Sequence, residues 1–450
     1  MIDVIAADTI KAPQKPKNRY AYYVFFVLFA ATFLNGLDGS EFTGAANVIA
    51  RELHLGINDV GVLTSAFTIF LTVSIVPVGI WADHARRSYV IAACLAVWSL
   101  ATALTGLAGG FLALFATRMF TGIGEAGYMP AGYSVVGDSF ADDQRTRVIS
   151  WLSIAGLVGP ILGMVLGGVI AGLAPGSWRW AFLATGIPGL LLAFLAWRLH
   201  EPPRQQTVTV IGDPGMPTYG ALKPGEVITH LVALLRNPML VCLTVIGVLT
   251  TFTASALQTY FPILLQQHDT FSLTSGQAAS FAGLVLGPTA LVGVILGGYL
   301  ADWLTRRYRG ARILVCVVSV LLTAPLNIAS LLIANTHNLA LFGAILIPTF
   351  FINTLHIGPL AAAVLDVVPA QQRASAVAIS VFVQRILGTA FAPLLIGLLA
   401  RAFDPSGLHF LNGIAGHDLI LALLCTCPLA FISAGIVGIL GLRGVRTAGE

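Results

Sequence analysis

Five charged residues lie inside long apolar stretches of the 450-residue sequence: Asp38, Glu41, Arg118, Glu125 and Arg385. A charge at the centre of a membrane-spanning helix costs from about 2.5 to more than 10 kcal/mol, so such residues pair with one another or line a water-filled cavity. The chemistry open to them is ion pairing, anion binding and reversible protonation. They are therefore the first candidates for a functional site.

The spacing of these residues limits how they can interact. Asp38 and Glu41 are three residues apart and share one face of a helix. Arg118 and Glu125 are seven apart, about 10.5 Å along a helix axis, which is too far for a direct pair within one helix. Each of the two therefore needs a partner from another helix.

The composition indicates that the solvent around these helices is lipid. Hydrophobic residues make up 57% of the chain and charged residues only 10%, with a mean hydropathy of +0.87. Soluble globular proteins carry about 25% charged residues. Because about 20 apolar residues span a bilayer, the sequence predicts an all-α membrane protein with twelve transmembrane helices. The expected spans are 20–50, 58–82, 88–109, 111–140, 146–173, 180–199, 237–266, 275–304, 311–334, 338–367, 374–401 and 417–442.

A polar stretch with five prolines divides the spans into six and six. The expected parts are a tail at 1–19, a six-helix bundle at 20–199, a linker at 200–236, a second bundle at 237–442 and a tail at 443–450. Apart from Arg118 and Arg385, which lie well inside spans, nineteen Lys and Arg residues fall at or beyond the span ends on the side of the tails and linker, and only Arg51, Arg179 and Arg401 on the other. Because Lys and Arg accumulate in cytoplasmic segments, both termini and the linker are expected in the cytoplasm.

The two halves repeat one another. A Gly-x-x-x-Asp sequence followed by two arginines occurs after the second span, at Gly79–Asp83, and again after the eighth, at Gly298–Asp302. An Asp and an Arg also recur at an offset of 228 residues, as Asp138 with Asp366 and Arg145 with Arg373. Such repeats are typical of transporters whose substrate site lies at the repeat interface near the midplane.

These motifs resemble those of the major facilitator superfamily. The Gly-x-x-x-Asp…Arg loop is similar to its signature, and Arg118-x-x-Thr-Gly-x-Gly124 is similar to its second motif. Within the superfamily the chain resembles the Spinster branch, through Arg118–Tyr128, Asn35 with Asp38 and, loosely, Trp178–Trp180 and Val368–Arg373. The resemblance implies two six-helix bundles around a central cavity and proton-linked export of lysophospholipids or sphingoid lipids. Two positions depart from that branch, because its first-span Arg is Gly39 here and its eleventh-span Asp is Thr389.

The resemblance also implies that the first and fourth spans line the cavity. We therefore predict that Arg118 neighbours Asp38 and that Glu125 faces the cavity as the proton site, with Asp38 competing for Arg118. A carboxylate at the wall of such a cavity suits reversible protonation. The alternatives are an Asp38–Arg118 pair that only braces two helices, a static hydrogen bond at Glu125, and a place for Glu41 near the outer interface.

Substrate contacts are predicted for polar residues inside the spans. Arg385, in the eleventh span, is suited to an anionic headgroup and can replace the Arg that is missing at Gly39. For His356 a hydrogen-bonded packing role is an equal alternative. The predicted binding residues are Asn35, Glu41, Tyr128, Gln258, Tyr260, Asn353, His356, Gln384 and Arg385.

Gating and hinge residues are predicted from the repeats. Asp83 with Arg87, and Asp302 with Arg306, are expected to latch the cytoplasmic side, with plain positive-inside topology as the alternative. A helix hinge is predicted at Gly159, Pro160 and Pro393. The glycines around Pro160 resemble the superfamily's antiporter motif, although small residues every four positions also serve ordinary helix packing.

The remaining patterns exclude other functions. The Gly122-x-Gly124-x-x-Gly127 sequence lies in an apolar helix without a βαβ unit, so it is no dinucleotide site. We expect no enzyme activity, no metal, no cofactor beyond a proton gradient and no nucleic-acid partner. The leading hypothesis is a monomeric, proton-coupled exporter of a lipid-like substrate in a bacterial inner membrane, in contact with membrane lipids. The alternatives are a proton-coupled transporter of a small organic anion or drug, and a non-transporting membrane scaffold or receptor.

Overall fold

The structure, a computed structural model, describes residues 18–140, 142–199, 236–267, 270–308, 310–368, 373–403 and 416–447. All regular elements in these ranges are helices, as the sequence predicts. Eleven of the described helices are long and apolar enough to cross a membrane. The remaining expected span, the fourth at 111–140, is present as two shorter consecutive helices. The predicted linker and N-terminal tail lie almost wholly outside the described residues, whereas the last helix continues into the predicted C-terminal tail as far as Thr447.

The helices fall into two groups that correspond to the two predicted halves. The first group is α1 Asn18–Glu52, α2 Ile57–His84, α3 Arg87–Thr105, α4 Phe111–Glu125, α5 Tyr128–Ser139, α6 Asp142–Ala171 and α7 Trp178–Trp197. The second group is α9 Pro238–Gln266, α10 Ser275–Ser280, η1 Phe281–Leu286, α11 Gly287–Thr305, α12 Ala311–Ile333, η2 Ala334–Thr336, α13 Leu339–Thr354, α14 Ile357–Asp366, α15 Arg373–Val383, η4 Gln384–Ala390, α16 Phe391–Phe403 and α18 Gly416–Thr447.

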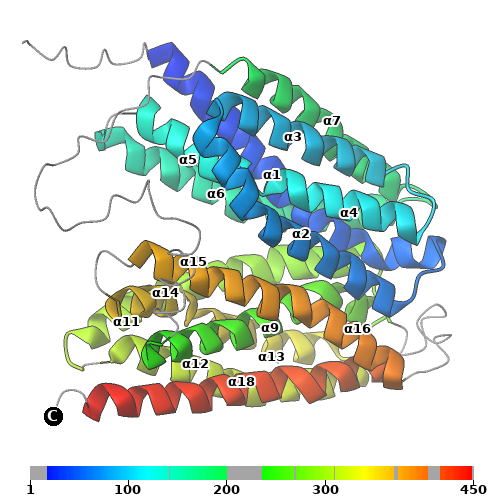
Figure 1. Ribbon diagram of the computed structural model, residues 1–450. Coiled ribbons are helices and arrows are strands. Elements are labelled where there is room, and N and C mark those ends of the chain that lie inside the picture. The colour runs from blue at the N-terminus through cyan, green and yellow to red at the C-terminus, as the bar shows by residue number, and fades with distance from the viewer. Residues whose placement is uncertain are drawn as a thin grey trace, which may run out of the picture.

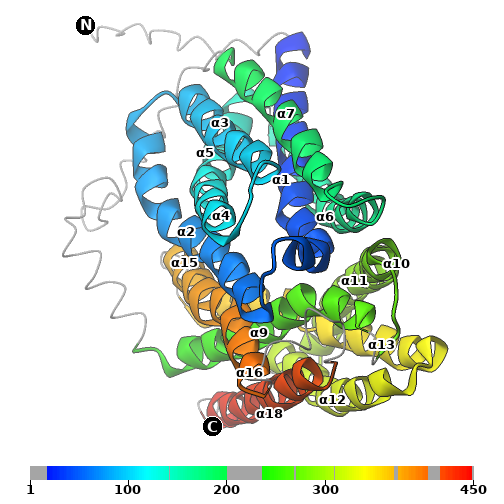
Figure 2. The same ribbon diagram turned by 90° about the vertical axis from the view of Figure 1, so that its right-hand side faces the viewer.

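The two groups pack as separate bundles, drawn above and below one another in Figure 1. Helix α1 begins and α18 ends at the same face of the molecule, which we call the terminal face. Figures 1 and 2 show the bundles meeting toward the opposite face, through α2 and α16 among others, and Figure 1 shows them diverging toward the terminal face. We call the face where they meet the closed face.

Contacts between the bundles at the closed face are close and partly polar. Asn47 Nδ2 donates a hydrogen bond to Gln266 Oε1 at 3.0 Å, which joins the end of α1 to the end of α9. A Cβ atom on Gly168 would overlap Ala279, and one on Gly61 would overlap the Pro393 carbonyl oxygen and the Tyr260 hydroxyl. Glycine is therefore required where the helices of the two bundles touch.

Small residues also bring α1 and α6 together inside the first bundle. A Cβ on Gly159 or Gly163 would overlap the backbone of α1, and one on Gly44 would overlap the backbone of α6. Pro160 lies in the same contact, with its ring against Gly36, and α6 continues through it as an α-helix. The glycine repeat thus serves close helix packing, and the predicted hinge at Gly159, Pro160 and Pro393 stays a prediction.

Side chains at the closed face tie the loops of the first bundle to its helices. Glu52, the last residue of α1, accepts hydrogen bonds from Gly176 N at 2.6 Å and from Trp178 Nε1 at 2.8 Å. Arg179 donates to the carbonyl oxygens of Gly106 and Ala108 at 3.1 and 2.7 Å, just beyond the end of α3. A cation at that position stabilises carbonyl groups that the helix leaves unpaired.

Four spans depart from a regular α-helix near the middle of the molecule. The fourth span breaks between α4 and α5 at Ala126–Gly127, and the tenth breaks between α13 and α14 at Leu355–His356. In the second bundle, η1 and η4 are π-helical segments inside otherwise α-helical spans. Such interruptions are frequent at functional sites because they redirect side chains within a helix.

Leucine at Gly61 is expected to force the bundles apart at the closed face. Gly79 in the same helix has open space at its Cβ position and is the matched control. Asn47 is only 3% exposed, so in a variant that lacks the native cysteines and carries Asn47→Cys, maleimide labelling should be slow. We expect Gly61→Leu to accelerate it on the order of tenfold, the effect of one to two kcal/mol. Equal labelling rates in Gly61→Leu and Gly79→Leu would contradict this role of the contact.

Candidate functional site

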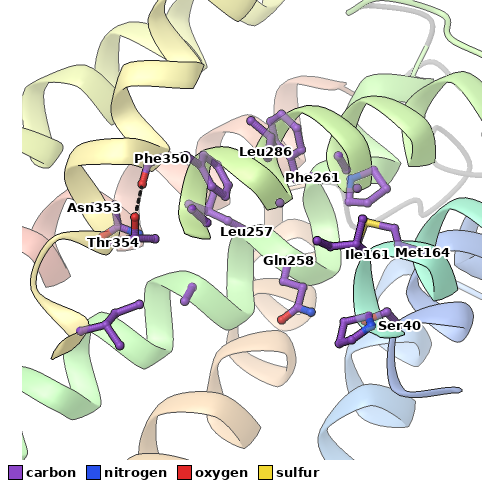
Figure 3. A pocket seen from close by; sticks show the side chains of 18 of the residues that line it. Ser40, Ile161, Met164, Leu257, Gln258, Phe261, Leu286, Phe350, Asn353 and Thr354 are labelled. Atoms are coloured by element: carbon purple, nitrogen blue, oxygen red, sulfur yellow. Dashed lines mark hydrogen bonds between the residues drawn. The ribbon is translucent and has the colours of Figure 1, made fainter. Parts of the chain in front are cut away.

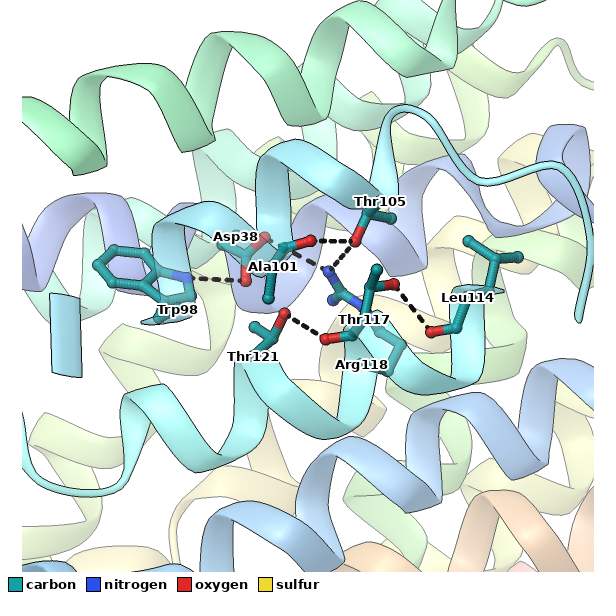
Figure 4. A network of polar contacts seen from close by, with 8 residues as sticks. All are labelled: Asp38, Trp98, Ala101, Thr105, Leu114, Thr117, Arg118 and Thr121. Atoms are coloured by element: carbon teal, nitrogen blue, oxygen red, sulfur yellow. Dashed lines mark hydrogen bonds and ion pairs between the residues drawn. The ribbon is translucent and has the colours of Figure 1, made fainter. Parts of the chain in front are cut away.

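Asp38 and Arg118 form an ion pair in the interior of the first bundle (Figure 4). Arg118 Nη2 on α4 lies 3.7 Å from Asp38 Oδ1 on α1, and the two side chains are 2% and 0% exposed. The predicted neighbourhood of these two residues is therefore confirmed. Because breaking a buried pair leaves an uncompensated charge, the two helices are held together at this point.

Two residues that were not predicted from the sequence complete the pair. Trp98 Nε1 on α3 donates to Asp38 Oδ2 at 3.1 Å. Arg118 Nη2 donates to Thr105 Oγ1 at 3.3 Å, and Thr105 Oγ1 in turn donates to the Ala101 carbonyl at 3.0 Å (Figure 4). The Arg118 guanidinium also lies over two aromatic rings, with its Cζ 5.3 Å from the centroid of Phe42 and 5.6 Å from that of Phe182.

Several polar atoms around the pair have no hydrogen bond. They are Asp38 Oδ1, Arg118 Nε, Glu41 Oε2, Glu125 Oε1 and Asn35 Nδ2, all buried. Unsatisfied buried polar atoms are costly, and a partly satisfied network favours rearrangement over a single fixed arrangement. This group of side chains therefore has hydrogen-bonding capacity for a proton or a new partner.

A cavity of about 650 Å³ lies between the bundles, and we call it the polar chamber. Glu125 and Arg385 both line it, whereas Asp38 and Arg118 do not. The prediction that Glu125 faces a cavity is confirmed. Other predicted binding residues in the lining are Asn35, Tyr128 and Gln258.

Glu125 connects the polar chamber to the buried pair. It is the last residue of α4, directly before the break in the fourth span, and is 9% exposed. Its carboxylate interacts electrostatically with Asp38 and Arg118 on one side and with Arg385 of the other bundle. Arg385 lies in the π-helical segment η4. The helix break and the π-helical segment thus place opposite charges from the two bundles at one chamber.

An apolar pocket of about 280 Å³ adjoins the polar chamber (Figure 3). It lies among α6, α9, α11 and α13 and is lined mainly by aliphatic and aromatic side chains. Ser40, Pro160 and Gln258 line both the pocket and the chamber, so the two spaces share a wall. Of the predicted binding residues, Asn353 and His356 line this pocket but not the chamber, whereas Gln258 lines both. The pocket was not predicted from the sequence.

Three predicted binding residues lie in the lining of neither space. Glu41 is 1% exposed, inside the first bundle near Asp38 and Thr185. Tyr260 is fully buried and donates to the Pro393 carbonyl at 2.6 Å. Gln384 packs against Gly247 of α9. Their predicted substrate contacts stay predictions, but in this conformation each would need a rearrangement to reach a ligand.

At the terminal face of the second bundle, Arg312 contacts two acids. Arg312 Nη2 lies 3.7 Å from Asp302 Oδ1, and Nη1 lies 2.5 Å from Asp366 Oδ2. Arg312 was not predicted from the sequence, whereas the predicted Arg306 is exposed. Arg87 is partly buried, and the Asp83 side chain lies outside the described residues. The ion pair between Arg312 and Asp302 lies within the second bundle, and the latch between bundles stays a prediction.

A comparison with known families agrees with this architecture. The sequence model of the Major Facilitator Superfamily matches residues 28–393, which is most of the chain. The chain belongs to the Major Facilitator Superfamily. With its apolar helices, this member of the superfamily is a multi-pass integral membrane protein.

Among superfamily members, Spinster proteins are similar to this chain. Protein spinster of Drosophila melanogaster is 26% identical over 390 residues, which cover 86% of this chain and 63% of the fly protein, less than two thirds of its length. Protein spinster homolog 1 of Rattus norvegicus is 29% identical over 402 residues, which cover 85% of this chain and 74% of the rat protein.

Solved structures of the superfamily share the fold. A bacterial homologue of the human lysosomal transporter Spinster, in an inward-facing and occupied conformation, gives a TM-score of 0.82 at 22% identity and covers 95% of this chain and 98% of that one. The nucleoside transporter NupG gives a TM-score of 0.69 at 11% identity and covers 93% and 99%. The predicted major facilitator fold of two helical bundles is confirmed.

Replacing Arg118 with methionine is expected to lower the free energy of unfolding by about 3–5 kcal/mol, because Asp38 would be left as an unpaired buried charge. Adding Asp38→Asn to that variant should recover part of the loss. Arg401, an exposed arginine of α16, is the matched control, and Arg401→Met should change stability by less than about 0.5 kcal/mol. Thermal unfolding of the purified protein measures both. Equal effects at Arg118 and Arg401 would show that the pair does not stabilise the bundle.

Proposed function

We propose that this chain is a secondary transporter that works by alternating access, through proton-coupled export of an amphipathic, lipid-like anion. The observation that carries the proposal is the polar chamber with its two opposed charges, Glu125 and Arg385, directly beside an apolar pocket. One space suits a charged headgroup and a proton site, and the other suits a hydrocarbon tail. Membership of the Major Facilitator Superfamily and the similarity to Spinster proteins support the transporter part of this proposal.

Glu125 is the proposed proton site. It reaches the polar chamber and also interacts with the buried Asp38–Arg118 pair. Protonation of Glu125 removes its charge from the vicinity of both Arg385 and Arg118. Arg118 then keeps its ion pair with Asp38, and Arg385 loses the negative charge beside it. Proton binding and substrate binding are in this way coupled through one carboxylate.

Arg385 is the proposed headgroup site. A guanidinium presents several donors in a planar fork, which matches the oxygens of a phosphate or carboxylate. Gly39, where the Spinster branch is expected to carry an Arg, lines the same chamber and has open space at its Cβ position. The chamber therefore has room for a headgroup beside α1. The tail of the ligand would pass Gln258 into the apolar pocket.

The charge distribution supports an orientation with both termini in the cytoplasm. Nineteen of the Lys and Arg residues at or beyond the span ends fall on that side and three on the other. The closed face is then extracellular, and the divergent bundles of Figure 1 correspond to an inward-facing state. We propose that the protein lies in a bacterial inner membrane, surrounded by membrane lipids. One chain builds the whole site, so we propose that it works as a monomer.

A small organic anion or a drug is the second candidate substrate. The polar chamber alone, at about 650 Å³, falls in the range of small-molecule sites. Gly39 and Thr389 both line it and lack the charges that the Spinster branch carries there, which favours a less highly charged ligand. A scaffold without transport activity has no use for opposed charges in a chamber between two bundles. Substrate-dependent proton flux separates it from both transporters.

Glu125→Gln is expected to abolish proton-driven transport because the amide cannot take up a proton. In proteoliposomes with an imposed pH gradient, wild-type protein should move a fluorescent lysophospholipid with accompanying proton flux, and Glu125→Gln should lose both. Exchange at equal pH on the two sides should persist, because the binding site is intact. Glu52→Gln is the matched control, since Glu52 lies at the closed face, where it accepts hydrogen bonds from Gly176 N and Trp178 Nε1. An unchanged pH dependence of transport in Glu125→Gln would refute the assignment.

Arg385→Gln is expected to weaken the binding of decyl phosphate about 10- to 100-fold, because a hydrogen bond to a charged group contributes about 1.5–3 kcal/mol. Arg385→Lys should retain part of the affinity, since it keeps the charge without the planar fork. Arg147, an exposed arginine of α6 outside the chamber lining, provides the control Arg147→Gln. Titration calorimetry on the protein in nanodiscs measures the affinities. Equal affinities of wild type and Arg385→Gln would rule out this headgroup site.

A further inference from the structure

The apolar pocket has a polar wall that a hydrocarbon chain does not need. Asn353 lines the pocket and is 8% exposed, and its Oδ1 atom has no hydrogen-bond partner. The threonines of the lining differ, because Thr250, Thr251 and Thr354 each donate to main-chain carbonyls of their own helices. A buried acceptor without a partner costs about 1–3 kcal/mol. A ligand that donates a hydrogen bond to Asn353 Oδ1 would remove this cost.

His356 adds a second acceptor to the same wall. It is 5% exposed and lines the pocket, and its Nδ1 is hydrogen-bonded to the main-chain carbonyl of Asn353. In a neutral ring that contact assigns the proton to Nδ1, which leaves Nε2 as an acceptor. Asn353 and His356 therefore offer hydrogen-bond acceptors to a ligand in otherwise apolar surroundings.

These residues lie away from the side of the pocket that adjoins the polar chamber. Figure 3 shows Asn353 and Thr354 on one side and Ser40 and Gln258 on the other, with Leu257 between them. Ser40 and Gln258 belong to the wall that the pocket shares with the chamber. A ligand whose head lies in the chamber therefore meets Asn353 with a part remote from its head.

The internal repeat supports a ligand role for this position. Glu125 and Asn353 are 228 residues apart, the offset that relates Asp138 to Asp366. Each lies just before a helix break, Glu125 at the end of α4 and Asn353 near the end of α13. The same break thus presents a side chain to the polar chamber in one half and to the apolar pocket in the other, charged in the first case and neutral in the second.

We infer that Asn353 and His356 bind a hydroxyl group on the apolar part of the substrate, and so select a hydroxylated chain over a plain one. A hydroxyl has one proton to donate and also accepts. It can donate to Asn353 Oδ1 or, with the amide turned round, accept from Asn353 Nδ2 and donate to His356 Nε2. A site built to hydrogen-bond such a group rejects the analogue that lacks it. This inference rests on the proposed function, because it takes the chamber as the site of the headgroup.

The test compares ω-hydroxyalkyl phosphates of six to twelve carbons with the parent alkyl phosphates, by calorimetry on the protein in nanodiscs. We expect the hydroxyl to increase affinity about 5- to 10-fold at the chain length that reaches Asn353, and Asn353→Leu to remove this gain. His356→Phe should reduce it. Thr349→Val is the matched control, because Thr349 lies one turn earlier on α13, is 2% exposed and is outside the pocket lining.

A second series, with trimethylammonium in place of phosphate, separates the inference from the proposed function. In one outcome the hydroxyl increases affinity in both series, Asn353→Leu removes the increase, and phosphate compounds bind no more tightly than trimethylammonium compounds. That outcome supports the hydroxyl site and overturns the anionic substrate. A preference for phosphate without any hydroxyl gain, or with a gain that survives in Asn353→Leu, overturns the hydroxyl site alone. Failure of every compound to bind overturns both. Asn353→Ala replaces the leucine variant if that variant does not fold.

Discussion

The structure depends on the cost of placing charges in an apolar bundle. Asp38 and Arg118 are almost fully buried, and each lowers the cost of burying the other. Trp98 and Thr105 add hydrogen bonds from α3, so three helices of the first bundle converge on one pair. Glu125 stands between that pair and the polar chamber. A change in the charge of Glu125 therefore alters the electrostatic interactions of both Arg118 and Arg385, which lies in the other bundle.

The two bundles differ in how they contribute to the site. The first supplies the acids and the buried pair, on helices that pack through glycine contacts between α1 and α6. The second supplies Arg385 and most of the apolar pocket, and it contains both π-helical segments of the described chain. Headgroup chemistry is thus shared between the bundles, whereas the space for an apolar chain lies mainly in the second. The shared wall at Ser40, Pro160 and Gln258 joins the two functions.

The fold was predictable from the sequence because lipid imposes strong rules on length and charge. Long apolar runs fixed the helices, and the scarcity of charges inside them singled out Asp38, Arg118 and Glu125, whose proximity the structure confirms. Trp98 and Thr105 were missed because their types are ordinary in such helices, and only the tertiary arrangement brings them to the pair. The break after Glu125 and the segment η4 carry no clear local signal. The apolar pocket was missed because its lining is mainly aliphatic and aromatic, and such residues occur throughout these helices. Arg312 was missed because it is one of many arginines at cytoplasmic span ends, where the positive-inside rule already accounts for a basic residue.

The segment η4 also bears on how this protein can change over evolutionary time. A π-helical turn accommodates one residue more than an α-helical turn, without ending the helix on either side. Loss of that residue would return the turn to a regular α-helix and leave the helix that follows close to its present orientation. The α16 contacts at the closed face would then be kept, while the residues inside η4, Arg385 among them, would face in different directions. A single-codon deletion in η4 is thus a short mutational route to a new specificity, while the first bundle and its buried pair remain as they are.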